Sequence, residues 1–81
     1  MNQTTLNKLS PGEHGTVAEI ASKTTSIKQR LLEMGLTKGT SIEMVRFAPM
    51  GDPIEISLRG YRLSLRKVEA ESVVVRQDPA K

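Results

Sequence analysis

The sequence predicts a mainly β fold with one short helix, closed into a small barrel of about five strands. Apolar and polar residues alternate with a period of two in residues 54–58 and 61–65, as they do in strands with one buried face. A helical repeat of apolar residues appears in one stretch, residues 26–36. The 81 residues suffice for one small domain, and closing its sheet into a barrel removes most exposed strand edges.

The composition excludes several classes of site. No cysteine is present, which excludes a disulfide framework, a thiolate zinc site and a cysteine nucleophile. We find neither a secretory signal pattern nor an apolar stretch long enough to cross a bilayer, so we expect a cytoplasmic protein. The net charge of +3 permits an acidic or nucleic-acid partner without requiring one.

A single domain should cover residues 6–76, because the two ends of the chain are polar and aperiodic and are expected to be flexible: residues 1–5 and 77–81. Pro11 and Gly12 fit the central positions of a type II turn, where proline presets the first φ and glycine accepts a positive one. A first strand over residues 16–21 should follow this turn.

The helix should begin at Ser26, whose side chain can cap it with Gln29 as the capping-box partner. Gly35 fits the left-handed position after the helix, and Leu36 can then close onto Leu31 in a Schellman motif. The helix should span about 8 residues. Its apolar stripe recurs at helical spacing and should face the core: Ile27, Leu31 and Met34.

Residues 41–47 should form a strand, and the two alternating segments after it should pair as a hairpin around Arg59 and Gly60. This register places three apolar pairs opposite each other: Leu58 with Tyr61, Ile56 with Leu63, and Ile54 with Leu65. The other face carries Glu55 diagonal to Arg62 and Arg66. A helical step over KVEA and a last strand in SVVVR complete a barrel of SH3-like type.

The segment APMGDP, residues 48–53, should be a turn rather than a catalytic loop. Pro49 and Pro53 withhold ladder donors, Gly51 accepts unusual φ values, and Asp52 can accept backbone N–H bonds in an Asx-type turn. The segment also lacks the spacing of a phosphate-binding P-loop. Met50 at the loop tip either folds back onto the barrel, which we favour, or contacts a partner.

The sequence gives little support for a catalytic site or a metal site. His14 is the only histidine, which is too few imidazoles for a transition-metal site in a chain without cysteine, so we expect no metal or cofactor. No nucleophile elbow occurs, and we expect no enzymatic activity and no small-molecule substrate. The face with Arg59, Arg62 and Arg66 could follow a phosphate backbone, but with only two aromatic residues we favour a solvated polar face.

Three segments together resemble the FeoA family, the small cytosolic component of bacterial ferrous iron uptake: LSPGEHGTVAEI, KQRLLEMGLTKGT and VRFAPMGDPIEISLRGYRLSLRKVEAESVVV. The resemblance extends over residues 6–76. It implies an SH3-like barrel that acts by binding the membrane transporter FeoB, a GTP-hydrolysing ferrous iron permease. It also implies that the protein, a monomer when isolated, meets the membrane only through this partner and need not contact iron.

The resemblance also indicates a docking surface, centred on the helix and with weaker candidates beside it: Arg30, Leu31, Leu32, Met34, Arg46 and Met50. Leu31 also fits a core position, whereas Leu32 lies roughly 140° around the helix from Ile27 and should be partly exposed. Two alternatives remain open. One is a small barrel that binds nucleic acid through its arginines, and the other is a GTPase-activating role in which Arg30 reaches the nucleotide.

Overall fold

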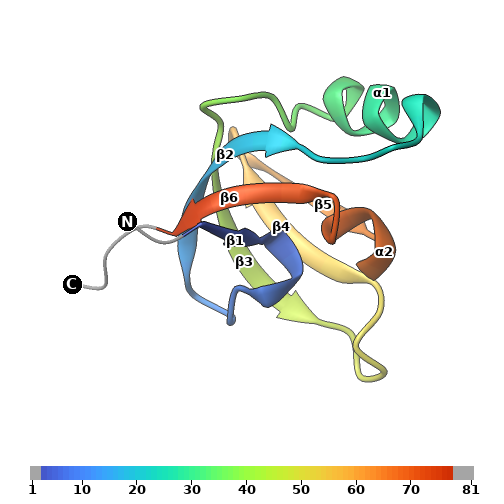
Figure 1. Ribbon diagram of the computed structural model, residues 1–81. Helices are drawn as coiled ribbons and strands as arrows, with labels where there is room; N and C mark the ends of the chain where they lie inside the picture. Colours follow the sequence, from blue (N-terminus) through green and yellow to red (C-terminus); the bar gives the residue numbers. More distant parts are fainter. Residues whose placement is uncertain (1–2, 78–81) are drawn as a thin grey trace.

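The computed structural model describes residues 3–77, which form six strands and three short helical segments (Figure 1). The elements in chain order are β1 (Gln3–Thr5), the 3₁₀ helix η1 (Leu6–Lys8), β2 (His14–Ile20), α1 (Thr25–Glu33), β3 (Ser41–Phe47), β4 (Ile54–Leu58), β5 (Tyr61–Leu65), α2 (Lys67–Ala70) and β6 (Val73–Gln77). The prediction of a mainly β fold with one short helix, built as a small SH3-like barrel, is confirmed.

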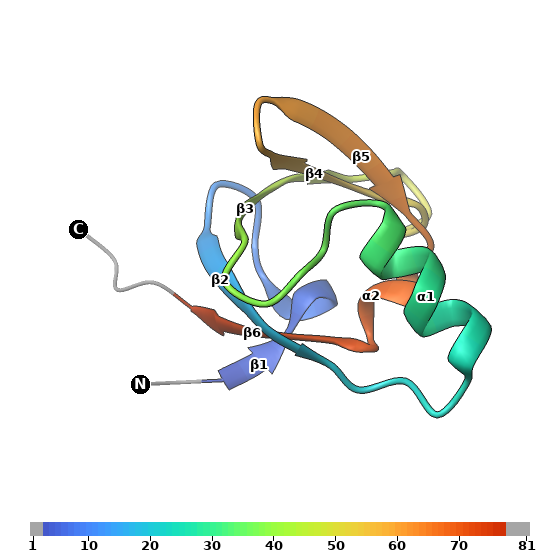
Figure 2. The same ribbon diagram turned by 90° about the horizontal axis from the view of Figure 1, so that it is seen from above.

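All six strands pair antiparallel in one sheet, in the order β1-β6-β2-β3-β4-β5. In this order β1 and β5 are the two edge strands. The sheet curls around a single core (Figure 2). Irregular register after Val17 in β2 and after Met44 in β3 accompanies this curvature, as β-bulges do in small barrels. In residues 3–77, no helix is long and apolar enough to cross a membrane.

The core is made of apolar side chains from nearly every element: Leu6, Leu9, Val17, Leu31, Leu36, Ile42, Met44, Ile54, Ile56, Leu58, Leu65, Ala70, Val73 and Val75. The alternation in β4 works as the sequence predicts, because every second residue of this strand is buried. In β5 the same pattern buries Leu65 fully but leaves Tyr61 exposed, although its strand partner Leu58 is buried.

The hairpin register is confirmed residue by residue, including the pair Leu58 and Tyr61 that closes it. Arg59 and Gly60 form the two-residue turn with φ values of 49° and 85°. Two positive φ values in succession are typical of a type I′ turn, whose twist matches that of the flanking strands. The turn at Pro11 and Gly12 is also present, with Gly12 at φ 91°.

The end of α1 is as predicted, but its beginning is not. Gly35 has φ 101°, its N–H donates to Leu32 O at 3.0 Å, and Leu36 N donates to Leu31 O at 3.1 Å, which is the Schellman pattern. The predicted Ser26 cap with Gln29 is wrong, because α1 begins at Thr25, after Thr24. Thr24 makes no side-chain cap bond, but its N–H donates to the Ser22 hydroxyl at 3.1 Å, just before the helix.

The prediction of five strands misses β1. Residues 1–5 are predicted to lie outside the domain, but Thr4 pairs with Val75 and the strand extends the sheet at its edge. At the other end, Gln77 belongs to β6 and pairs with Gly15. The remaining terminal residues, 1–2 and 78–81, lie outside the described part of the chain. The first strand also begins earlier than predicted, at His14.

Candidate docking surfaces

Helix α1 is inserted between β2 and β3 and lies over one end of the barrel, next to α2 and β5 (Figures 1 and 2). Leu31 attaches it, because this side chain is fully buried in the core, with Ile27 and Met34 packed partly against it. Leu31 is therefore a core residue in this structure, and its side chain is not available to a partner. The exposed surface of α1 is polar except at Leu32, which is 39% exposed.

A second exposed apolar side chain lies at the C-terminal turn of α1. Tyr61 is 45% exposed, and its hydroxyl donates to the carbonyl oxygen of Met34 at 2.7 Å. The backbone at Gly35 lies close to Tyr61: a Cβ added to Gly35 would lie 2.8 Å from the Tyr61 hydroxyl. Leu32 and Tyr61 thus provide the apolar part of a surface that we call the helix surface, formed by the exposed side of α1 and Tyr61.

Arg30 lies on the side of α1 that faces α2. Its guanidinium is 3.5 Å from the carboxylate of Glu69, a buried residue of α2. Glu69 also accepts a hydrogen bond from the backbone N–H of Arg66 at 3.0 Å. The carboxylate therefore joins the two helices, and Arg30 is held at the edge of the helix surface by this ion pair.

The loop between β3 and β4 extends from the opposite end of the barrel (Figure 1). Met50 at its tip is 92% exposed, so the prediction that it folds back onto the barrel is wrong. The predicted Asx turn is also absent, because the Asp52 carboxylate accepts the backbone N–H of Lys67, at the start of α2, at 2.9 Å. This bond joins the loop to α2, where Val68 is 59% exposed. We call the loop, residues 48–53, and residues 66–68 the loop surface.

A charged cluster lies on the outer face of β3, β4 and β5. Glu55 is 2.9 Å from Arg46 and 3.4 Å from Arg62, and the hydrogen bond from Arg46 is the main reason that the pKa of Glu55 lies below its usual value. Arg66, expected near Glu55, instead begins α2. Arg59 donates to the hydroxyls of Thr37 and Thr40, so the predicted arginine face is divided among several local contacts.

The candidate partner-binding residues consequently form two groups rather than one. Arg30, Leu31, Leu32 and Met34 belong to the end of the barrel covered by α1, whereas Arg46 and Met50 belong to the end with the β3–β4 loop. Tyr61 and Val68 are missing from the predicted set. Val68 was detectable as an apolar residue between Lys67 and Glu69, whereas Tyr61 was assigned to the apolar face of the hairpin and is exposed in the structure.

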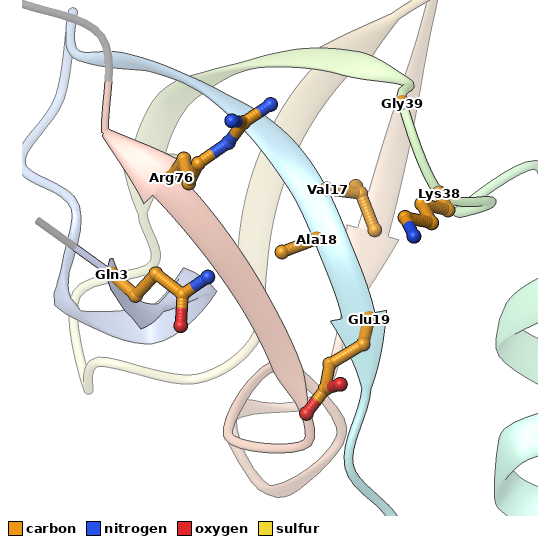
Figure 3. A pocket seen from close by; sticks show the side chains of 7 residues that line it. All are labelled: Gln3, Val17, Ala18, Glu19, Lys38, Gly39 and Arg76. Carbon is orange, nitrogen blue, oxygen red and sulfur yellow. The ribbon is translucent and has the colours of Figure 1, made fainter. Parts of the chain in front are cut away.

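Neither of two hollows lined by residues within 3–77 is built as a catalytic centre. The larger has a volume of about 390 Å³ and is lined by Gln3, Val17, Ala18, Glu19, Lys38, Gly39 and Arg76. Figure 3 shows that its charged groups, on Arg76, Lys38 and Glu19, point in different directions rather than toward a common point. The smaller, about 110 Å³, lies beside the β3–β4 loop. Within residues 3–77, no group of three or more metal-ligating side chains is assembled, and His14 is exposed.

The comparison with known proteins agrees with this architecture. The profile of the FeoA domain matches residues 4–77. A curated relative from Porphyromonas gingivalis, an Fe(2+) transport protein A/Fe(2+) transporter FeoB fusion protein, is 30% identical over 70 residues. The match covers 86% of this chain but only 8% of that relative, so the chain corresponds to a small part of the fusion.

Two solved structures are similar over nearly their whole length. The NMR structure of a FeoA-like protein from Clostridium acetobutylicum has a TM-score of 0.90 and 34% identity, and the match covers 100% of this chain and 93% of that one. The crystal structure of FeoA from Stenotrophomonas maltophilia with zinc, described as a procaryotic SH3 domain protein, has a TM-score of 0.80 and 31% identity. That match covers 93% of this chain and 95% of the other.

Proposed function

Because this chain belongs to the FeoA family, we propose that it is a non-enzymatic accessory protein of ferrous iron uptake that docks on the cytoplasmic side of a FeoB-type transporter. In this proposal the helix surface makes the contact, and binding changes the assembly of the transporter or its GTP hydrolysis. The protein itself is cytoplasmic and reaches the membrane region with its partner.

The observation that carries the proposal is the fused relative. In the Porphyromonas gingivalis protein, a segment 30% identical to this chain and a FeoB transporter form one polypeptide. Fusion raises the effective concentration of one module near the other, which favours contacts that are weak between separate chains. The Stenotrophomonas maltophilia FeoA is itself described as possibly acting as a ferrous iron transport activating factor.

The helix surface suits such a contact on physical grounds. Leu32 is exposed but not required for packing, whereas its neighbour Leu31 holds the helix to the core. Burying the exposed parts of Leu32 and Tyr61 against a partner would contribute about 25 cal/mol for each Å² of apolar area removed from water. The Tyr61 bond to Met34 keeps this turn of the helix in a fixed position, which reduces the entropy lost on binding.

Binding of the purified protein to full-length transporter tests the proposal. The transporter is placed in nanodiscs of uncharged phosphatidylcholine, so that the lipid itself attracts no basic residue, and binding is measured at low and high salt. We expect saturable binding that changes little with salt, and Leu32→Glu should weaken it at least tenfold without unfolding the protein. Gln3→Glu is the matched control, since it adds the same charge at an exposed position of β1, outside the helix surface.

Single-stranded RNA serves as the comparison ligand. Binding through phosphates would weaken steeply with salt, with a log–log slope of about −0.7 for each phosphate contacted. RNA binding without transporter binding would contradict the proposal and favour the nucleic-acid alternative. Unchanged transporter binding by a folded Leu32→Glu variant would remove α1 from the docking surface.

A further inference from the structure

The β3–β4 loop, which is the projecting part of the loop surface, lies at the end of the barrel opposite α1 (Figure 1). Met50, 92% exposed, occupies the tip of a narrow loop that extends beyond the barrel (Figure 1). An isolated methionine in this position contributes nothing to the core. Val68 on α2 is 59% exposed and belongs to the same surface, because the Asp52 carboxylate holds the start of α2 against the loop at 2.9 Å.

Basic residues flank the loop and the start of α2. Arg46 lies four residues before Met50 at the end of β3, and Arg66 and Lys67 lead into α2, all of them exposed. Arg62 is joined to Arg46 through Glu55. These four cations face two nearby carboxylates, those of Asp52 and Glu55, both of which already accept hydrogen bonds. Glu71 lies beyond the other end of α2, and so the surface around the loop carries an excess of positive charge.

The backbone of the loop has few N–H groups without a hydrogen-bond partner. Pro49 and Pro53 have no N–H group, the N–H of Gly51 donates to Ala48 O at 2.7 Å, and the N–H of Ala48 donates to Pro53 O at 3.0 Å. Four of the six residues in 48–53 therefore present no free backbone donor. A backbone donor without a partner opposes transfer out of water, so this arrangement lowers the cost of moving the tip into a lipid headgroup layer.

We propose that the loop surface contacts an anionic phospholipid bilayer directly, with Met50 entering the headgroup region and the basic residues binding lipid phosphates. The inference goes beyond docking on a transporter, since it does not require one. A projecting apolar tip with cations distributed over β3, β5 and α2 fits a flat, fluid, negatively charged surface better than a shaped pocket in a protein. Because one apolar tip and few charges contribute, binding should be weak and reversible.

The absence of tryptophan from the chain makes a direct test possible. Met50→Trp places a single fluorescent reporter at the loop tip, and Leu32→Trp places one on the helix surface as the matched control. Vesicles of phosphatidylglycerol with phosphatidylcholine should shift the emission of Met50→Trp to shorter wavelength, whereas vesicles of phosphatidylcholine alone should not. The emission of Leu32→Trp should not shift with either vesicle. Equal shifts for both variants, or none for Met50→Trp, would overturn the proposal.

Charge reversal provides a second, independent measurement on the otherwise unchanged protein. In co-sedimentation with phosphatidylglycerol vesicles, Lys67→Glu should lower the partition coefficient about fivefold or more, since each basic residue near an anionic membrane contributes roughly that factor. Lys38→Glu makes the same charge change in the loop between α1 and β3 and should have a much smaller effect. Equal loss in the two variants would indicate attraction by net charge alone and would contradict a specific loop surface.

The same variants separate this inference from the proposed docking function. Met50→Ser should weaken vesicle binding and leave binding to transporter in uncharged nanodiscs unchanged, whereas Leu32→Glu should do the reverse. Loss of transporter binding by Met50→Ser, with vesicle binding unaffected, would show that the loop meets a protein instead and would overturn the lipid proposal.

Discussion

The hydroxyl of Tyr61 donates a 2.7 Å hydrogen bond to the backbone carbonyl of Met34, and so joins the first residue of β5 to the C-cap of α1. The last carbonyls of a helix have no partner within the helix, and this bond satisfies one of them. It connects the inserted helix to a barrel strand at the surface that we propose for docking. The position of α1 therefore depends on a side chain outside the helix.

Tyr61→Phe removes only this hydroxyl. We expect the free energy of unfolding to fall by about 0.5–1.5 kcal/mol, the usual net contribution of one hydrogen bond. Amide hydrogen exchange in the last turn of α1 should become faster, while exchange in β2 and β3 should change only by the global loss of stability. If amide exchange throughout α1 is the same in Tyr61→Phe and in the unchanged protein, the bond does not position the helix.

Gly35→Ala should destabilise more than the same change at Gly12. Both glycines have positive φ, 101° and 91°, and share the backbone strain of about 1–2 kcal/mol that alanine meets there. Only at Gly35 does the added Cβ meet a neighbour, the Tyr61 hydroxyl at 2.8 Å, whereas nothing lies within 4 Å at Gly12. Chemical denaturation measures both losses. In a Tyr61→Phe background the excess at Gly35 should largely disappear, and its persistence would refute this contact as the cause.

Leu31→Ala and Leu32→Ala compare two adjacent leucines of α1. Leu31 is fully buried, so its truncation should cost about 2–5 kcal/mol through lost burial and a residual cavity. Leu32 is 39% exposed, and its truncation should change the free energy of unfolding by less than about 1 kcal/mol. Thermal and urea denaturation of both variants checks this, and similar losses at the two positions would contradict the observed orientation of the helix.

Asp52→Ala should loosen the loop surface. The lost bond from Lys67 N is expected to reduce the free energy of unfolding by about 0.5–2 kcal/mol, as for a helix cap. Asp52→Asn keeps a side-chain oxygen that can accept the same bond, and should retain most of the stability. A loss in Asp52→Asn as large as in Asp52→Ala would point to the charge of Asp52 rather than to its hydrogen bond.

Glu55 should make stability depend on pH in the acidic range. Arg46 and Arg62 hold its pKa in the folded state below the unfolded value near 4.5. A carboxylate with a lowered folded-state pKa stabilises the fold above its unfolded pKa, and this contribution disappears as the pH falls through the folded-state value. The melting temperature of Glu55→Gln should therefore lie below that of the unchanged protein at neutral pH, and the two should converge in acid. A constant difference down to the lowest pH at which the protein remains folded would exclude the carboxylate charge as the cause.

Local sequence patterns were sufficient for much of the fold. The register of the β4–β5 hairpin, the Schellman end of α1 at Gly35 and the turn at Gly12 all agree with prediction. The N-terminus of α1 was predicted wrongly because Ser26 and Gln29 match a capping box that the structure does not use. For the candidate site, the sequence identified Leu32 as an exposed apolar residue but grouped Met50 with the helix.

The features that the sequence by itself determined have interacting residues within about a dozen positions of one another, because there the alternation of side chains and the φ preferences of glycine act directly on the chain. Only the tertiary structure decided the pairing of β1 with β6, the bond between Asp52 and Lys67, and the bond between Tyr61 and Met34. These contacts join segments that no local pattern relates. Packing of the barrel brings the segments together, and it also places α1 and the β3–β4 loop at opposite ends of the molecule.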